Sequence, residues 1–250
     1  MNSSALSDAL LDLIQRQPNA EKAVTYLIQQ ADAYRKTPTQ PIFYRVFTAM
    51  PRVVGKQVIT VPPATADEIQ NLRNGFTVEG WTLDRLARVW WLLHLSPDDQ
   101  SAYISTLENL FKAAEMNELV ALYSALPVLH YPEHWRFLAT EAVRSNIGPV
   151  QEALMLHNPY PAEQLDEPAW NQLIMKAFFS DKAVEQITGF QERTNERLAR
   201  IAIDYAQERR AAGRTIHPEL WTLVKPFVTE GNRTELEALF GTHGTAGAPA

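Results

Sequence analysis

HNPYPAEQLDEPAWNQLIMKAFF, residues 157–179, joins a polar turn with two prolines to a helix that is apolar on almost its whole surface. A helix that is apolar on nearly every side belongs in the interior of a protein. The stretch therefore predicts a protein of packed helices, with this helix near its middle.

Polar side chains interrupt this apolar surface: Asn171, Gln172 and Lys176 lie close in sequence to the turn 158–161. Buried polar groups need hydrogen-bond partners, either from the protein or from a bound molecule. We therefore expect this segment to be the binding site for a ligand or a partner. The alternative is a structural role, in which Asn158 caps the local backbone and Lys176 reaches water along its apolar stem.

Apolar residues recur at helical spacing along most of the chain. The pattern predicts helices over residues 5–16, 20–35, 41–50, 81–95, 101–114, 116–126, 133–146, 148–157, 166–180, 182–189, 194–212, 217–224 and 234–240. Residues 51–63 are the only weak strand candidate. Since one strand cannot form a sheet, we interpret them as a connection.

Local signals predict several helix starts. Thr65-Ala66-Asp67-Glu68 resembles a capping box that opens a helix. Ser96 before Pro97 is typical of an N-cap followed by the first helical residue. The pairs Asp98-Asp99 and Asp166-Glu167 also lie beside prolines at expected helix starts, where negative charge is favourable. We therefore interpret these carboxylates as caps rather than as acid–base pairs.

The expected fold is all-α. Helices between residues 81 and 212 recur roughly every 15–20 residues with short connections, a rhythm typical of stacked antiparallel helix pairs in HEAT- or armadillo-like α-solenoids. A compact all-α bundle is the alternative. We expect N-terminal helices over residues 1–62, packed as one domain with a helical-repeat region over 63–228, and a disordered tail over 241–250.

Composition narrows the classes of function. The chain has 250 residues and a formal net charge of −6, which argues against a nucleic-acid binder and gives no attraction to anionic lipid. It has no cysteine, which excludes disulfides and thiolate sites. No segment has the features of a signal peptide or approaches the roughly 20 apolar residues of a membrane span. We therefore expect a cytoplasmic protein without direct membrane insertion.

Familiar catalytic motifs are absent. The sequence has neither a Gly-rich phosphate loop nor a GxSxG nucleophile elbow. His130 and His134 have metal-ligand spacing, but Pro132 between them predicts a loop followed by a helix start, so we assign no metal and no cofactor. Arg209, Arg210 and Arg214 form a small basic helix end that is either a solvated face or a site for an anionic partner.

Several segments carry a family resemblance. They include the opening stretch and, in order, FTAMPRVVGK (47–56), NELVALYSALPVL (117–129), AVRSNIGPVQEALMLHNPYP (142–161), IDYAQERRAAGR (203–214) and PELWTLVKPF (218–227). Together they resemble the EboA family over about residues 40–228. Within these segments the candidate binding residues are Asn158, Tyr160, Trp170, Asn171, Gln172, Lys176, Asp204, Tyr205, Glu208 and Trp221.

The resemblance implies a place in a bacterial gene cluster (the ebo cluster) for making or trafficking a secondary metabolite. It implies co-encoded partners, such as a UbiA-type membrane prenyltransferase or a sugar-phosphate-cyclase-like enzyme. The family has no settled activity, so the resemblance implies no catalytic residue. We expect a non-catalytic accessory or scaffold protein that binds a partner enzyme or an intermediate through residues 157–179. The alternative is an enzyme that uses Lys176 with nearby polar residues on a prenylated or sugar-derived intermediate.

Overall fold

The computed structural model describes residues 3–241 and confirms the all-α fold. Those residues form no strand, and their β pairing is limited to an isolated antiparallel bridge between Val58 and Thr82. The bridge lies in the weak strand candidate, which is therefore a connection, as predicted. The tail expected to be disordered lies, apart from Gly241, outside the described residues.

The described residues form fourteen α-helices and four short 3₁₀ turns. In chain order these are α1 (Ser3–Gln15), α2 (Glu21–Lys36), α3 (Gln40–Val53), α4 (Pro63–Leu72), α5 (Leu83–Leu92), α6 (Gln100–Ala113), α7 (Met116–Ala125), η1 (Leu126–Val128), η2 (Pro132–Trp135), α8 (Arg136–Arg144), α9 (Gly148–Met155), α10 (Tyr160–Gln164), α11 (Glu167–Phe179), η3 (Val184–Gln186), α12 (Glu196–Ala211), α13 (Glu219–Val224), η4 (Lys225–Phe227) and α14 (Arg233–Phe240).

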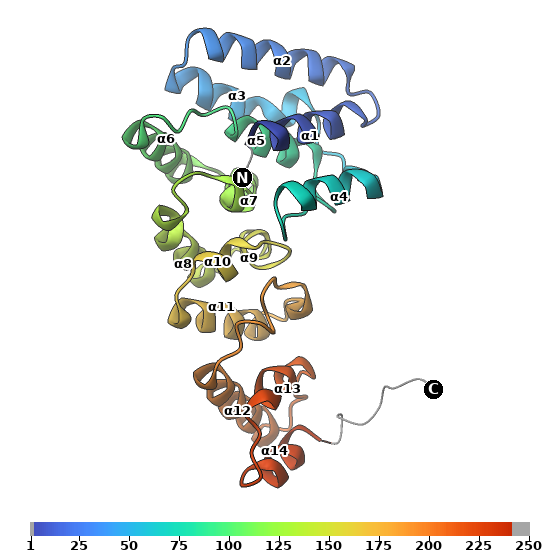
Figure 1. Ribbon diagram of the computed structural model, residues 1–250, viewed down its shortest axis with the longest axis vertical. Coiled ribbons are helices and arrows are strands. Elements are labelled where there is room, and N and C mark those ends of the chain that lie inside the picture. Colours follow the sequence, from blue (N-terminus) through green and yellow to red (C-terminus); the bar gives the residue numbers. More distant parts are fainter. Residues whose placement is uncertain (1–2, 242–250) are drawn as a thin grey trace.

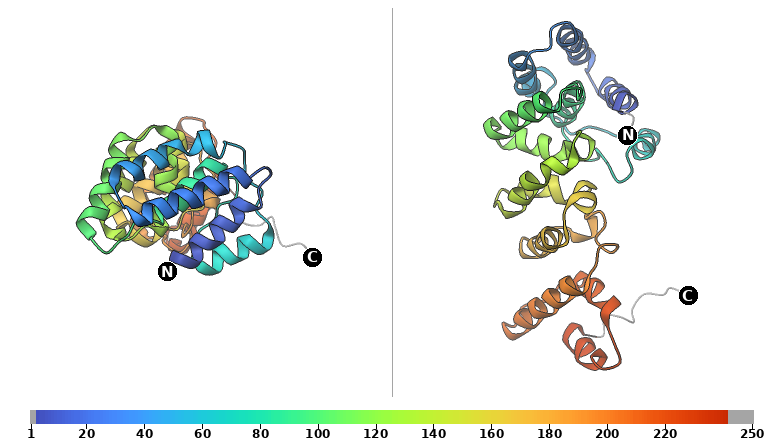
Figure 2. Two further views of the ribbon diagram at one scale, coloured as in Figure 1. Left: turned by 90° about the horizontal axis from the view of Figure 1, so that it is seen from above. Right: turned by 60° about the vertical axis from the view of Figure 1, so that its left-hand side comes forward.

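The helices follow one another along the long axis of the molecule (Figure 1). Helices α1–α3 lie at one end and α12–α14 at the other, with α5, α7, α9 and α11 in successive layers between them. The side view in Figure 2 shows the same order. Each layer contacts mainly the next layer along the axis, while the HEAT- or armadillo-like repeat stays a prediction.

Helix α5 is the centre of the N-terminal core because it packs against α1, α3 and α7. Trp91 is fully buried there, stacks on Phe43 at 5.3 Å between ring centroids, and donates its indole N–H to the Phe43 carbonyl over 3.0 Å. The same helix buries a cation, Arg88, which is 1% exposed. Its Nη1 lies 2.8 Å from Oδ2 of Asp84, so an ion pair within the helix offsets part of the cost of burying this charge.

Three sequence-based helix boundaries were wrong. Helix α4 begins at Pro63, so Thr65 is a buried residue of its first turn and not a cap. Asp99, rather than Ser96, caps α6, because Ser96 bonds with Asp98 in a preceding turn. Residues 182–189 form only the 3₁₀ turn η3, because left-handed backbone at Asp181 and Gly189 confines it.

The interpretation of the carboxylates as caps is confirmed for one residue of each pair, Asp99 and Asp166. Asp99 accepts a hydrogen bond from the backbone N–H of Ala102, and Asp166 accepts one from Ala169. Both bonds satisfy an N–H that the first turn of a helix leaves free. Asp166 thereby fixes where α11, the apolar helix of the opening stretch, begins.

Candidate functional site

Both polar atoms of the Asn158 side chain form hydrogen bonds with the backbone around the turn that precedes α10. Its Nδ2 donates to the carbonyls of Tyr123, over 3.1 Å, and Ala153, over 2.9 Å, and its Oδ1 accepts from the N–H of Tyr160 over 3.0 Å. The residue is 3% exposed. Backbone groups therefore meet the polar atoms of this side chain, and Asn158 joins α7, α9 and α10.

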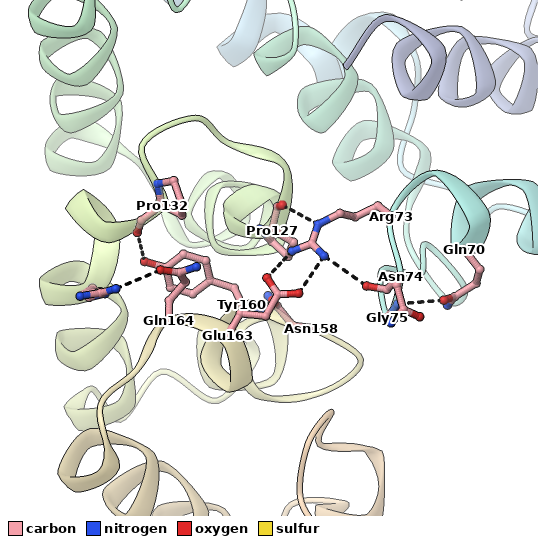
Figure 3. Close-up of polar contacts among 11 residues, drawn as sticks. Gln70, Arg73, Asn74, Gly75, Pro127, Pro132, Asn158, Tyr160, Glu163 and Gln164 are labelled. Carbon is pink, nitrogen blue, oxygen red and sulfur yellow. Dashed lines mark hydrogen bonds and ion pairs between the residues drawn. The ribbon is translucent and has the colours of Figure 1, made fainter. Parts of the chain in front are cut away.

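Tyr160 extends the same junction. Its buried hydroxyl donates to the Pro132 carbonyl over 2.6 Å, which ties α10 to η2 (Figure 3). Burial raises the pKa of this phenol above its usual value, so the hydroxyl keeps its proton and acts as a donor. Asn158 and Tyr160, which both belong to the predicted turn, thus hold neighbouring backbone in place.

A bidentate ion pair connects α10, at the junction formed by Asn158 and Tyr160, with the N-terminal half of the molecule. Arg73, which follows α4, binds both carboxylate oxygens of Glu163, and its Nε donates to the Pro127 carbonyl over 2.9 Å (Figure 3). The turn after Arg73 also touches the junction, since a Cβ added at Gly75 would lie 3.1 Å from Cβ of Pro159. Residues 90 positions apart are held together here, a link that no local sequence signal reveals.

The buried polar residues of α11 also find partners within the chain. Asn171 and Asn195 exchange amide hydrogen bonds of 3.1 and 2.8 Å. Trp170 is fully buried beneath the guanidinium of Arg193, which lies 4.8 Å from the ring centroid. The indole N–H of Trp170 has no hydrogen-bond partner among the described residues.

The remaining polar residues of α11 face outward. Gln172 is exposed. Lys176 is half-buried, and its Nζ donates to Oδ1 of Asn146 over 3.1 Å. Within the described part of the chain no ion pair joins Lys176 to a carboxylate. A carboxylate that converges with Lys176 in a pocket would favour the enzyme alternative, and among residues 3–241 the amine is bonded to Asn146 instead.

The candidates on α12 and α13 lie apart from the turn. Asp204 and Glu208 are exposed. Tyr205 packs edge-on against Phe179 at 4.8 Å and lines a hollow of about 210 Å³ with Arg209. Trp221 packs against Phe240 at 5.4 Å. The structure therefore does not gather the sequence-based candidates into one site.

A larger hollow lies between α6, α7 and α8, and we call it the α6–α8 hollow. Its volume is about 440 Å³, within the range of small-molecule sites. It is lined by Glu108, Phe111, Lys112, Tyr123, His134, Phe137 and Leu138. Phe137 is 70% exposed although it is a large aromatic residue, and it lines the hollow together with the apolar rings and chains of Phe111, Tyr123 and Leu138.

The α6–α8 hollow has a polar edge on one side. His134 Nε2 lies 2.9 Å from Glu108 Oε1, and Lys112 Nζ lies 3.7 Å from Glu108 Oε2. The hydrogen bond from His134 lowers the pKa of the Glu108 carboxyl, and the charge of Lys112 also lowers it. The hollow can therefore take an apolar group on its aromatic wall and a polar group at this edge.

The predicted turn braces the walls of the α6–α8 hollow. Asn158 holds the backbone of Tyr123, whose hydroxyl in turn donates to the Leu138 carbonyl over 3.3 Å. Tyr160 holds Pro132, two residues before His134. Asn158 and Tyr160 thus lie behind the hollow and position residues that line it.

Two features were missed by sequence reasoning. Phe137 lies in the first turn of α8, and its neighbours at helical spacing, His134, Thr140 and Glu141, are polar; this single aromatic residue on a polar helix face is the signal that was available. His134 was considered only as a metal ligand with His130. Within residues 3–241, no three His, Asp or Glu side chains come together as a set that could hold a metal ion.

Comparison with known proteins gives one match. A family model described as "Metabolite traffic protein EboA" matches residues 6–225, which is well over half of the chain. No curated protein and no solved structure gives a significant match.

Proposed function

Since the chain belongs to the EboA family of metabolite traffic proteins, we propose that it is a non-catalytic accessory protein that binds a metabolite or a partner enzyme in transit. The family description is consistent with an accessory trafficking role. Within the described residues no helix is long and apolar enough to cross a membrane. Cytoplasmic location and a place in secondary-metabolite biosynthesis are part of this proposal.

The observation that carries the proposal is the α6–α8 hollow with Phe137 exposed at its edge. Aromatic residues that are solvent-exposed before binding contribute strongly to recognition, because they bury a large area with little loss of side-chain entropy. Asn158 and Tyr160 belong to the predicted turn 158–161, which we call the signature turn. Because they brace the hollow, the signature turn has a positioning role in the same function.

The expected occupant is an apolar group that also presents a polar atom to Glu108 and His134. An intermediate with an apolar body and a polar group would meet this description, and so would a segment of a partner enzyme with an apolar side chain beside a polar one. Of the co-encoded proteins, the UbiA-type prenyltransferase and the sugar-phosphate-cyclase-like enzyme are the proposed partners. The exposed side of α11, with Gln172 and Lys176, stays an alternative contact surface.

Retention of the co-encoded proteins and their extracted metabolites on the immobilised chain tests the proposal. Phe137→Ser should abolish retention if the α6–α8 hollow is the contact surface. Phe179→Ser replaces an exposed phenylalanine of α11, 59% exposed, and should abolish it only if α11 is the contact surface. Val58→Ser, which removes an exposed apolar side chain elsewhere, is the control and should retain the same proteins. Failure of the wild-type chain to retain any of them would overturn the proposal.

A further inference from the structure

A second groove, far from the signature turn in sequence, lies between α1, α2 and the end of α5. Its volume is about 510 Å³, again within the range of small-molecule sites. Apolar side chains line it, among them Leu11 of α1, Ala31 of α2 and Leu93, the residue that follows α5. Trp90 and His94 line it as well, and serines and charged residues of α1 and α2 lie around them.

Trp90 has an unused hydrogen-bond donor. It is 2% exposed, and its indole Nε1 has no partner among the described residues. Two other buried indoles differ, since Trp91 donates to the Phe43 carbonyl and Trp135 to the His130 carbonyl. Trp170 shares the unpartnered indole of Trp90. A buried donor without a partner costs about 1–3 kcal/mol in general, and it is uncommon enough in native proteins to need an explanation.

His94 supplies an acceptor on a ring that touches the Trp90 ring. Its Nδ1 lies 3.1 Å from the Trp90 carbonyl, and a carbonyl only accepts, so Nδ1 carries the proton. The neutral ring then leaves Nε2 as an acceptor. The two rings are in contact, with centroids 4.2 Å apart. Burial and the positive charge of Arg35 both lower the pKa of His94, which favours this neutral form.

We propose that this groove binds a small apolar molecule with a hydroxyl group, which accepts from Trp90 Nε1 and donates to His94 Nε2. A hydroxyl is the smallest group that does both, whereas a carboxylate has no proton for Nε2 and an ammonium cannot accept from Nε1. The carbon skeleton lies on the apolar side chains of Leu11, Ala31 and Leu93. Because Nε1 is shielded from water, the groove wall opens slightly when the hydroxyl enters.

The groove is separate from the α6–α8 hollow, and the two are lined by different residues. A second site for a hydroxylated molecule would let an accessory protein carry or sense a small alcohol or phenol while a partner occupies the first. This inference does not depend on the proposed function, because it follows from the donor and acceptor in the groove alone.

The test uses the full chain labelled with ¹⁵N and two probes, 2-naphthol and 2-methoxynaphthalene. The second probe keeps the oxygen as an acceptor but has no hydroxyl proton. Titration with 2-naphthol should shift the Trp90 indole signal downfield among those of the six tryptophans, with Trp90→Phe identifying the signal. The methoxy probe should bind about three- to tenfold more weakly, since it lacks one hydrogen bond.

Variants separate the two polar contacts. His94→Asn keeps a donor for the Trp90 carbonyl and removes the acceptor at Nε2, so it should weaken 2-naphthol binding about three- to tenfold and leave methoxy binding unchanged. Trp90→Phe should weaken both probes. Trp81→Phe, just before the opposite end of α5, is the matched control and should bind as the wild type does. If Trp90→Phe does not fold, His94→Asn and the comparison of the two probes still test whether the groove recognises a hydroxyl group.

Equal affinity for the two probes would overturn the inference. So would a titration that leaves the Trp90 signal in place, or an unchanged affinity in His94→Asn. A shift confined to Trp135, which stacks on Phe111 of the α6–α8 hollow, would place the probe in that hollow. That result would overturn the second site and leave the proposed function intact.

Discussion

Asn158 shows how much stability one side chain in the signature turn can supply. Replacing it with alanine leaves the Ala153 carbonyl and the Tyr160 N–H without these partners, and it removes one of the two bonds to the Tyr123 carbonyl, which still accepts from the Leu126 N–H. We expect Asn158→Ala to lower the free energy of unfolding by about 2–4 kcal/mol, because each unsatisfied buried group costs on the order of 1 kcal/mol or more. Urea denaturation followed by circular dichroism measures this difference.

Gln172→Ala is the matched control, because the same type of polar group is exposed there. Its effect should stay within about 0.5 kcal/mol, as for most surface substitutions. Equal effects of the two substitutions would contradict the role given to Asn158.

His94 gives the protein a dependence of stability on pH. Burial, opposed by the bond to the Trp90 carbonyl and assisted by Arg35, lowers its pKa below the ordinary value of 6.5. The unfolded chain therefore binds a proton at a higher pH than the folded chain does. Stability should be full above pH 6.5 and should fall as the pH drops from there towards the folded-state pKa.

Charged groups of two other helices line the same groove, namely Asp8 of α1 and Asp32 and Arg35 of α2. His94→Gln removes the imidazole and leaves these groups in place, so it should flatten the slope of stability against pH below about 6.5. Denaturation midpoints across that range measure the slope. An unchanged slope would mean that other groups cause it.

At the level of single residues, the sequence predicted that α11 is largely buried but not what its side chains touch. The apolar pattern predicted the burial of Trp170 correctly. The partner of Asn171 is 24 residues away, and Asn158 bonds to a carbonyl 35 residues away. Such pairs arise from the packing of layers, and no periodicity within one helix encodes them.

The segment between α11 and α12 is fixed by a close backbone approach. Gly189 has φ of +79°, and a Cβ added there would lie 2.7 Å from Cβ of Ala162 in α10. We expect Gly189→Ala to destabilise the protein by about 2–4 kcal/mol, from the left-handed backbone and the clash together. Thermal and urea unfolding measure the change.

Two further variants separate the causes. Gly80→Ala has a similar φ of +72° but open space around the added Cβ, so it should cost only about 1 kcal/mol. Adding Ala162→Gly to Gly189→Ala should remove the clash and recover part of the loss. A double variant no more stable than Gly189→Ala would show that the close approach to Ala162 is not the cause.

The positions of helices were predictable from the sequence where a single strong feature, such as periodicity or a capping carboxylate, determined them. Periodicity found the long helices, and the carboxylates at Asp99 and Asp166 were correctly interpreted as caps. The errors occurred where two signals competed over a few residues, as at Ser96 against Asp99. A window as short as 182–189 also holds too few turns for helical periodicity to exclude a 3₁₀ turn between residues of left-handed backbone.

On the scale of the whole molecule, the C-terminal layer is loosely joined to the layer before it. Helix α12 packs more extensively on α13 and α14 than on α11, and Figure 1 shows these three helices grouped at one end. The reciprocal amide bonds between Asn171 of α11 and Asn195, the N-cap of α12, lie at the junction. Layers that contact only their neighbours can open one at a time.

Hydrogen exchange read by mass spectrometry tests whether this layer opens separately. In Asn171→Ala, Asn195 loses its partner but still accepts from the Leu198 N–H as a cap. We expect exchange in α12–α14 to become about tenfold faster, the effect of a loss of about 1.4 kcal/mol in local stability. The amides of α5 and α7, in the core on the far side of α9, should keep the wild-type rate.

Lys176→Ala is the control, because Lys176 lies on the outer side of α11, the helix that carries Asn171. This substitution should change the exchange rate in neither region. Faster exchange in α5 and α7 together with α12–α14 would instead show that the array opens as one cooperative unit.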